Sequence, residues 1–456
     1  MEYSDVRQRP ARSLRASGPG FDPVASKLRR PLTRPGTISR SSLLGRLTRD
    51  DLRPIVSLVA PSGYGKTTLL SQWAERSGQP FAWVSIDEHD NDPKVLLSYV
   101  AEALDRVQPV GERVFEALAS PVSSVPGSVV PRLGSAFWSM TEPLVLVLDD
   151  VHLLHQTECR DALSVLADHV PGGSRLVLAG RNEPPLRIAR LRAEGRISEI
   201  GPGDLSLTRE EAISLWHAAG VTLGQDDLTA LHQRTEGWPA AISFGGDDRL
   251  VSQYMEAEFL ARVSHRHRVF LTRTAVLDRM CGPLCEAVLE LPGSAATLAE
   301  LSRSNLLLVP LDRRRMWYRY HHLFRDMLLA DLERLEPGLV PVLRRRAAQW
   351  CLRHGRTEEA LEYFMAAGDV DAAAGLRGEL AKERGPGASG APSLTAAELR
   401  VLPLLATHLS FPEIGAEMFL SPHTVKSQAM SIYRKLGASS RHQAVTRARD
   451  LGLLEG

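Results

Sequence analysis

Short runs of consecutive apolar residues recur through the first half of the chain and alternate with segments of helical periodicity. One run, IVSLV, begins at Ile55, and others read FAWVSI, LVLVL, RLVLAG and ISEI at residues 81–86, 144–148, 175–180 and 197–200. A continuous apolar run of this length is typical of a strand buried on both faces of a parallel sheet. We therefore predict an α/β domain, a parallel sheet with helices on both faces.

From Leu394 onward the pattern changes to four short helices separated by capping signals. These signals are Ser410 with Glu413, Ser421 before Pro422, Leu436-Gly437, Ser440 with Gln443, and Gly452. Serine three residues before an acid or amide forms a capping box, proline is favoured at the first helical position, and glycine ends a helix. The tight corner at residues 420–421 then predicts a helix-turn-helix, whose second helix normally lies in the DNA major groove.

The second helix of this pair, PHTVKSQAMSIYRK at residues 422–435, separates into two faces. Val425, Ala429 and Ile432 recur at spacings of four and three and form the predicted buried stripe. The residues left for DNA are His423, Thr424, Lys426, Ser427 and Met430 toward base edges, with Arg434 and Lys435 toward phosphates. The alternative is a helical bundle in which the basic residues are only a solvated face.

A phosphate-binding loop follows the first apolar run. Ala60, Gly65, Lys66 and Thr67 fit the P-loop spacing, with alanine in place of the first glycine. In such a loop backbone N–H groups surround phosphate oxygens, the lysine reaches the outer phosphates, and the next hydroxyl binds Mg²⁺. The loop residues expected to bind nucleotide are Ser62, Gly63, Gly65, Lys66, Thr67 and Thr68.

The run at residues 144–148 ends in two adjacent acids, Asp149 and Asp150. A buried parallel strand would deliver both carboxylates at the edge of the sheet that carries the P-loop. Asp149 with Thr67 suits a Mg²⁺ site, and Asp150 suits orienting an attacking water. Two acids after a strand also occur at ordinary surface turns. We expect at most a slow Mg²⁺-dependent ATPase that resets a conformational switch.

The C-terminal segment resembles the LuxR-type, or FixJ/NarL-type, DNA-binding domain along its whole length. The matching residues are Leu394, Thr395, Glu398, Val401, Leu402, Glu413, Ile414, Ser421, Pro422, Thr424, Val425, Lys426, Lys435, Leu436, Gly437, Ser440, Arg441, Ala444 and Val445. The resemblance implies that Lys426, Ser427 and Met430 face bases, and that the last helix, residues 441–450, pairs two such domains on DNA. Gly415 and Gln428 depart from the family pattern, and Pro403 interrupts the first helix.

Residues 27–375 are similar to the MalT-like branch of the STAND nucleotide switches, through LVLAGRNEPPLRIARLRAEGRISEI, TEGWPAAI, FLTRTAVLDRMCGPLCEAVL and WYRYHHLFRDML. This resemblance implies that Arg181 senses the γ-phosphate, Pro239 packs near adenine, and His321 touches the β-phosphate of ADP. It also places residues 38–40 near the base. The residues themselves leave other interpretations open: Arg181 pairs with Glu183, Pro239 only starts a helix, and His321 is a packed core side chain.

The two resemblances suggest an order of parts along the chain. We expect a disordered leader (1–26), a nucleotide-binding domain (27–200), a small helical domain (201–255), a winged helix (256–335), a short helical-repeat remnant (336–384), a linker (385–392) and the DNA-binding domain (393–456). Residues 343–376 supply only one helix pair. Since repeat arrays need about three units to bury their faces, this pair must pack on the winged helix or stay loose.

Composition adds a few constraints. The 456 residues include 55 basic and 54 acidic side chains, so a net charge of +1 neither supports nor excludes DNA binding. The cysteines at positions 159, 281, 285 and 351 form no CxxC pair, which favours packed thiols in a reducing cytosol over zinc ligands.

No apolar run is long enough for a membrane helix. The Arg-rich first 20 residues lack the apolar core of a secretory signal, and a transit peptide remains the alternative to a disordered leader.

These observations together predict a bacterial, cytoplasmic and nucleoid-associated transcription regulator. ATP or ADP, with Mg²⁺, would set its conformation or self-association, and its C-terminal domains would bind double-stranded DNA as a homodimer or larger homo-oligomer. RNA polymerase is a further expected partner. Two alternatives remain: a nucleotide-binding scaffold that recruits protein partners through the helical domain, and a DNA-binding protein with a vestigial nucleotide site.

Overall fold

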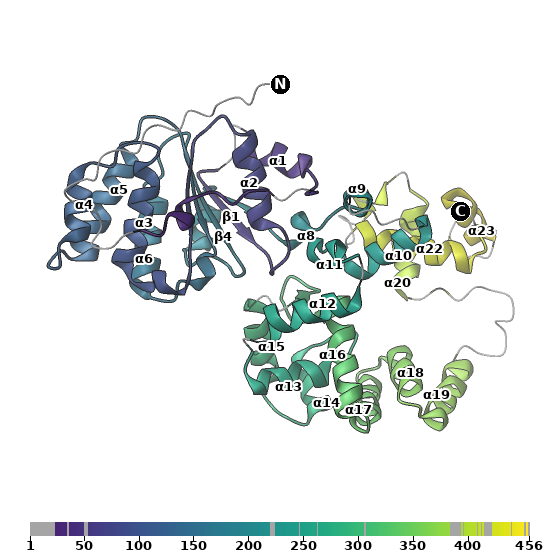
Figure 1. The fold of residues 1–456 in the computed structure, drawn as a ribbon. Coiled ribbons are helices and arrows are strands. Elements are labelled where there is room, and N and C mark those ends of the chain that lie inside the picture. The colour runs from purple at the N-terminus through teal and green to yellow at the C-terminus, as the bar shows by residue number, and fades with distance from the viewer. Residues whose placement is uncertain are drawn as a thin grey trace. The chain divides into compact units, whose positions relative to one another are not determined.

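The structure, a computed structural model, divides the chain into two compact units, residues 1–368 and 369–456 (Figure 1). The residues that it describes are 23–33, 36–49, 53–218, 224–245, 247–261, 263–304, 307–383, 394, 396–407, 409–411, 413–414, 422–438, 440–450 and 453–454.

A five-stranded parallel sheet forms the centre of the first half of the N-terminal unit. Its strands are β1 (Ile55–Val59), β2 (Phe81–Ser85), β3 (Val145–Asp149), β4 (Arg175–Gly180) and β5 (Ile197–Ile200). They lie in the order β2-β3-β4-β1-β5, and every neighbouring pair is parallel. All residues of β3 and β4 are buried, as expected of strands that are apolar apart from Asp149 at the end of β3 and Arg175 at the start of β4. The predicted parallel sheet is therefore confirmed.

Helices cover this sheet on both faces. They are α1 (Ser41–Leu47), α2 (Lys66–Arg76), α3 (Pro93–Asp105), α4 (Glu112–Ala119), α5 (Val130–Trp138), α6 (Thr157–Asp168) and α7 (Ile188–Ala193). Figure 1 shows α3 to α6 as a layer on one side of the strands, with α1 and α2 on the other. The apolar side chains of β3 and α3 to α6 join in one core cluster, so this domain has an interior of its own.

The rest of the N-terminal unit is mostly helical. Its elements are α8 (Pro202–Leu205), α9 (Arg209–Ala218), α10 (Gln225–Thr235), α11 (Pro239–Ser243), α12 (Asp248–Met255), α13 (His265–Thr274), α14 (Gly282–Leu289), α15 (Ser294–Arg303), β6 (Leu308–Pro310), β7 (Tyr318–Tyr320), α16 (His322–Leu335), α17 (Leu339–Arg353) and α18 (Thr357–Ala366). Short 3₁₀ turns are η1 (Ala25–Leu28), η2 (Glu88–Asn91) and η4 (Val151–Leu153), and π turns are η3 (Val125–Val129) and η5 (Glu256–Leu260). Strands β6 and β7 pair antiparallel, as in the wing of a winged helix.

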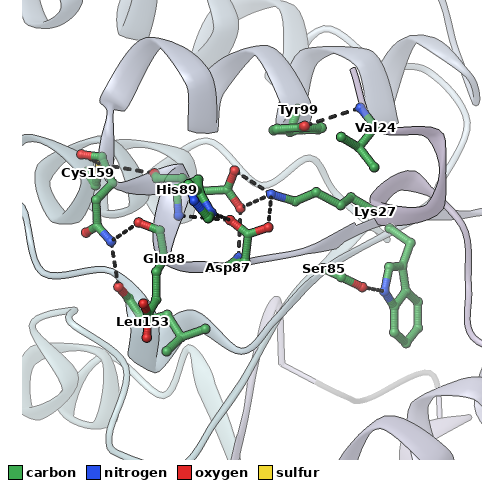
Figure 2. Close-up of polar contacts among 12 residues, drawn as sticks. Val24, Lys27, Ser85, Asp87, Glu88, His89, Tyr99, Leu153 and Cys159 are labelled. Carbon is green, nitrogen blue, oxygen red and sulfur yellow. Dashed lines mark hydrogen bonds and ion pairs between the residues drawn. The ribbon is translucent and has the colours of Figure 1, made fainter. Parts of the chain in front are cut away.

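A buried ion pair fastens the start of the described chain to the sheet domain (Figure 2). The Lys27 ammonium in η1 lies 2.6 Å from one Asp90 carboxylate oxygen and 3.1 Å from Asp87. It also stands 4.4 Å from the centre of the Tyr99 ring, whose hydroxyl accepts the Val24 N–H. The leader boundary that we placed after residue 26 therefore falls inside a turn that packs on the sheet domain.

A polar junction joins the end of α10 to β7. Arg319 donates to both carboxylate oxygens of Glu236, at 2.8 and 2.6 Å. The neighbouring His321 is buried, and its Nε2 lies 3.1 Å from the Thr235 carbonyl oxygen. Burial lowers the pKa of His321 to about 4, although the nearby Glu236 opposes this shift. Burial alone would raise the pKa of Glu236, but the hydrogen bond and charge of Arg319, together with His321 and the His322 N–H, outweigh it and lower the pKa to about 2.

The predicted helix pair packs on the winged-helix region. Helix α17 contacts α14, and the Trp350 ring meets Trp317 edge-on with centroids 6.4 Å apart. Arg346 of α17 pairs with Glu290 at 2.6 Å. Of the two possibilities that the sequence left open, packing on the winged helix is confirmed.

The C-terminal unit contains α19 (Val370–Glu383), α20 (Ala396–Leu405), α22 (Pro422–Lys435) and α23 (Arg441–Asp450). Val425, Ala429 and Ile432 are completely buried, so the predicted stripe of α22 is confirmed. Gly437 has a φ of +61°, as expected of the glycine that ends α22. Pro403 lies inside α20. The predicted linker at 385–392 and the signals at Ser421 and Gly452 fall outside the described residues.

Each predicted capping box shows at least one of its two hydrogen bonds. Glu413 accepts the Ser410 N–H at 2.7 Å, but the Ser410 hydroxyl donates to the same carboxylate at 2.6 Å instead of accepting a backbone N–H. The Ser440 hydroxyl accepts the Gln443 N–H at 3.3 Å. Of the helix predicted after Ser410, residues 411, 413 and 414 are described as helical and its end near Phe419 is not described.

Arg441 fastens α23 to the end of α20. Its guanidinium donates to four carbonyl oxygens, those of Leu404, Leu405, Thr407 and Leu409, at 2.6 to 3.1 Å. Carbonyls at and just beyond a helix end lack partners within the helix, so the arginine gives a donor to those of Leu405, Thr407 and Leu409, while Leu404 also accepts from Thr407.

All four cysteines are free thiols with buried side chains, as the sequence predicted. Among the described residues, no helix has the length and apolar character needed to cross a membrane.

Acid should destabilise the N-terminal unit through His321. The folded chain holds the pKa of this imidazole near 4, below the ordinary 6.5, so the unfolded chain binds the proton more readily. The contribution of His321 to the free energy of unfolding should therefore fall by up to about 3 kcal/mol between about pH 6.5 and pH 4. Asp149 contributes in the opposite direction below about pH 6, because the folded chain raises its pKa, so the test compares the denaturant unfolding of variants with that of the wild type. The His321→Asn variant should differ from the wild type by the His321 contribution, and His89→Asn, at a side chain 94% exposed, should keep the wild-type slope. Equal slopes in wild type and His321→Asn would contradict the prediction.

Arg441→Ala should loosen the C-terminal unit, because it leaves several helix-end carbonyls without their donor. We expect a loss of about 1–3 kcal/mol in local stability. Hydrogen exchange of the α20 and α23 amides in the full chain measures this loss. Arg449→Ala, at an exposed position on the same helix, is the matched control. Unchanged protection in Arg441→Ala would show that these hydrogen bonds do not hold the unit together.

Candidate nucleotide site and DNA-facing helix

A cavity of about 720 Å³ lies beside the P-loop in the N-terminal unit. Its lining includes Ile38, Arg40, Ser62, Gly63, Gly65, Lys66, Thr67, Thr68, Asp150, Leu207, Leu215, Arg181, Pro239 and Glu258. Every predicted nucleotide-binding residue except His321 is thus brought to one place. A volume of this size is within the usual range for a small-molecule site.

The P-loop connects β1 to α2 and requires glycine at two positions. Gly63 and Gly65 have φ angles of +78° and +77°, which side chains other than hydrogen disfavour. A Cβ atom on Gly63 would also lie 2.6 Å from the Ala240 Cβ, so no other residue fits. Ala60, which replaces the first glycine of the pattern, is fully buried, and its N–H bonds to the Gly180 carbonyl at 3.3 Å.

Lys66 begins α2 and turns back into the loop. Its ammonium donates to the carbonyl oxygens of Ala60 at 2.8 Å and Pro61 at 3.1 Å, and the residue is only 8% exposed. Burial lowers the pKa of Lys66 to about 8, although Asp150 and Asp149 oppose the shift. A buried ammonium whose direct partners among the described residues are carbonyl oxygens is suited to take an anion.

Thr67 and Asp149 lie side by side at the end of β3. The Thr67 hydroxyl donates to the Asp149 carboxylate at 2.7 Å. Burial raises the pKa of Asp149 to about 6, with a further contribution from Asp150. Asp150 adopts a left-handed backbone, φ +61°, and lines the cavity. The structure thus places a hydroxyl and two carboxylates together at the strand end, as the sequence suggested.

Residues from α11, α12 and η5 close the cavity over the loop. The Trp238 indole N–H donates to the Ser62 carbonyl and the Ala240 N–H to the Gly63 carbonyl, both at 3.1 Å. The Ser62 hydroxyl lies 2.9 Å from the Tyr254 hydroxyl and 3.1 Å from a Glu258 carboxylate oxygen. No local sequence pattern distinguishes Tyr254 or Glu258, so neither could be predicted from the sequence.

Arg181 follows β4 and pairs with Glu258. Its guanidinium lies 2.6 Å from the Glu258 carboxylate and also donates to the Glu258 backbone carbonyl at 3.0 Å. Glu183, the partner proposed as the simple alternative, pairs instead with Arg192. That alternative is therefore wrong, because the side chain of Arg181 turns toward η5.

Pro239 lines the cavity, whereas His321 does not. Pro239 is the first residue of α11 and also lines the cavity, so the structure is compatible with both interpretations of it. His321 is not among the lining residues. Its ring packs edge-on against Trp238, whose indole N–H bonds to the P-loop. The structure therefore does not bring His321 to the cavity and shows it as the packed side chain of the alternative interpretation.

The cavity also has an apolar end, formed by Ile38, Leu207, Leu215 and Pro239, of which Ile38 and Leu215 pack against the hydrophobic cluster that contains Leu207. Gln72 of α2 holds the segment before α1 here. Its amide donates to the Ile38 carbonyl at 2.7 Å and accepts the Arg40 N–H at 3.3 Å. The position of residues 38–40 beside the P-loop agrees with the place that the resemblance implies for the base.

Helix α22 in the C-terminal unit exposes part of its predicted DNA-binding face. Lys426 and Arg434 are exposed, and Met430 is 55% exposed. Lys435 differs, because its ammonium lies 2.7 Å from the buried carboxylate of Glu398. The side chains of His423, Thr424 and Ser427 fall outside the described residues.

Two protein-family models match the chain. The MalT winged helix domain matches residues 256–340, and the luxR family of bacterial regulatory proteins matches residues 392–448.

The chain is also similar to longer proteins. It is 30% identical to the transcriptional regulator MalT of Klebsiella pneumoniae over 371 residues, 76% of this chain and 41% of the relative. It is 28% identical to MalT of Vibrio cholerae over 427 residues, 86% of this chain and 45% of that one. The serine/threonine-protein kinase PknK of Mycobacterium tuberculosis is 29% identical over 368 residues, covering 76% of this chain and 33% of the kinase. The chain thus spans less than half of the length of these relatives.

Among solved structures, a Walker-type ATPase of Pyrococcus abyssi aligns with a TM-score of 0.47 and 16% identity, covering 66% of this chain and 98% of that one. The family assignment depends on the sequence matches, which agree with the β6–β7 wing and with the buried stripe of α22. Residues 256–340 therefore form a MalT-type winged helix domain, residues 392–448 form a domain of the luxR family of bacterial regulatory proteins, and most of the chain is similar to MalT.

Proposed function

We propose that this protein is a nucleotide-switched transcription regulator that binds DNA in a sequence-specific manner. The observation that carries the proposal is the cavity that joins the P-loop, Arg181 and an apolar end, in a chain that also has a luxR-family domain. Neither feature alone suggests a switch, but their presence in one chain does.

The cavity residues suit ATP or ADP with Mg²⁺. Lys66 would meet the outer phosphates, and the P-loop N–H groups would surround them. Thr67 and Asp149 would hold Mg²⁺, which would neutralise phosphate charge. Asp150 is the candidate for orienting a water, and any hydrolysis would be slow and serve to reset the switch. The apolar end would take the base. Adenine is favoured over guanine because the sequence has no NKxD or TKxD motif.

Nucleotide would act on the protein through the contacts that close the loop. A ligand shifts a conformational equilibrium only when it binds the two states with different affinity. Trp238, Tyr254 and Glu258 touch the P-loop in this closed arrangement, so a ligand that reshapes the loop would change how well they fit. The resulting open or closed state would govern self-association.

The C-terminal unit would bind double-stranded DNA through α22. Lys426 and Met430 are proposed to face base edges and Arg434 a phosphate, with the described exposure in support. Lys435 is the weaker candidate because Glu398 holds it. Two such units would pair through α23, and RNA polymerase is proposed as a further partner of the assembled protein.

A second candidate function is a nucleotide-binding scaffold whose C-terminal unit recruits a protein. The similarity to PknK favours this second function, because a protein named as a kinase matches 76% of this chain. Salt distinguishes the two functions. DNA binding through phosphates weakens steeply as salt rises, whereas docking through apolar contacts does not.

Lys66→Ala should abolish nucleotide binding, because the P-loop then lacks its buried cation. Calorimetry with ADP and ATP should show at least about a tenfold loss of affinity. Lys94→Ala is the control, since Lys94 bonds to the Ser120 carbonyl outside the cavity lining. Wild-type affinity and wild-type nucleotide-dependent DNA binding in Lys66→Ala would refute the switch.

Lys426→Ala and Arg434→Ala should weaken DNA binding. Bound fragments are first selected from genomic DNA by the purified full chain with ATP, ADP or neither. Titrations against salt should then show each variant losing about one unit of the salt slope if its side chain meets a phosphate, whereas a base contact would relax specificity instead. Arg400→Ala, exposed on α20, is the control. A wild-type protein that selects no DNA would favour the scaffold.

A further inference from the structure

We propose that Glu258 makes the closed cavity select a nucleoside diphosphate over a triphosphate. This inference rests on the proposed function and adds a specificity-determining residue to it. Glu258 lies in η5, within the residues matched by the winged-helix family model, yet its side chain reaches the nucleotide cavity.

The Glu258 carboxylate occupies donors that a phosphate would otherwise use. One of its oxygens lies 2.6 Å from the Arg181 guanidinium and 3.1 Å from the Ser62 hydroxyl. Arg181 and Ser62 border the same cavity as the P-loop lysine. Guanidinium groups and hydroxyls bind carboxylates and phosphates in the same way, so Glu258 stands where an anionic group of a ligand would be attractive.

The ion pair between Arg181 and Glu258 is exposed enough for a phosphate to replace the carboxylate. The side chains of Arg181 and Glu258 are 22% and 35% exposed, so breaking their contact leaves neither charge in a dry interior. A diphosphate that uses Lys66 and the loop N–H groups leaves the pair intact. A third phosphate would compete for Arg181 and would then face the released carboxylate, in addition to Asp149 and Asp150. The closed arrangement is therefore better matched to two phosphates than to three.

Release of the Glu258 side chain from Arg181 would also weaken the contacts between η5 and the P-loop. Arg181 donates to the backbone carbonyl of Glu258 as well as to its side chain, and Tyr254 in the preceding helix contacts Ser62. A triphosphate that draws Arg181 away thus removes contacts that hold η5 over the loop, beside the Tyr254 contact of α12. Binding of a triphosphate would in this way open the cavity, whereas binding of a diphosphate would leave it closed.

The same turn supplies a matched control. Glu256, two residues earlier, pairs with Arg268 at 2.6 and 3.0 Å and does not line the cavity. Its removal costs a carboxylate of the same turn and leaves Arg181 and Ser62 untouched. A general effect of charge or of turn stability would appear equally in both variants.

The experiment measures the dissociation constants of Mg·ADP and Mg·ATP by calorimetry for the wild-type full chain, Glu258→Gln, Glu258→Ala and Glu256→Gln. The wild type should prefer ADP. Glu258→Gln should raise the affinity for ATP about tenfold relative to that for ADP, because it removes a charge that competes for Arg181. Glu256→Gln should keep the wild-type ratio. Thermal unfolding of each variant is recorded in parallel, and Glu258→Ala repeats the test should the glutamine keep a hydrogen bond.

An unchanged ratio of ATP to ADP affinity in both Glu258 variants overturns the inference while leaving nucleotide binding in place. So does a lowered unfolding temperature with the wild-type ratio, which assigns Glu258 a structural role only. An equal shift in Glu256→Gln also refutes it. Absence of nucleotide binding in the wild type, matched by Lys66→Ala, overturns the proposed function itself.

Discussion

The pairing of the P-loop backbone with the segment at residues 238–240 is the contact on which the closed cavity depends. Trp238 and Ala240 donate to consecutive carbonyls of the loop, across 176 residues of sequence in the case of Trp238. This approach is so close that position 63 has no room for a Cβ atom. Hydrogen bonds of this kind are directional and cannot stretch far before they are lost. The loop therefore cannot change shape without releasing the segment that covers it.

The charges in the cavity also favour binding of a ligand at the P-loop. Burial shifts the pKa of Lys66 down and that of Asp149 up, so both groups lie in surroundings that disfavour their charged forms. Each keeps its charge through neighbours of the opposite sign or through hydrogen bonds. Phosphates with a divalent cation would offer better partners to both at once, since one brings negative charge to Lys66 and the other positive charge to Asp149. The closed site is thus prepared for an anion and a cation together.

What the sequence could predict follows from how far apart the interacting residues are. The five strands and the buried stripe of α22 depend on runs and spacings within a few residues, and they are found where expected. The partner of Arg181 lies 77 residues away, and local spacing suggested the nearer Glu183 instead. Lys435 likewise meets Glu398 on another helix, although both were visible in the motif. His321 was assigned to the ligand through the family, and only the packing of Trp238 shows that it is not part of the cavity lining.

The division of the chain into two units bears on how nucleotide could act on DNA binding. Among the described residues each unit has a hydrophobic cluster of its own, and the cluster around α22 includes residues of α20 and α23. A core common to both units would be one way for the P-loop to alter the shape of α22. Self-association does not need one, because bringing two C-terminal units together raises their effective concentration without changing either fold. The proposed switch would then act on how many DNA-binding units are held together, and the shape of each unit would stay constant.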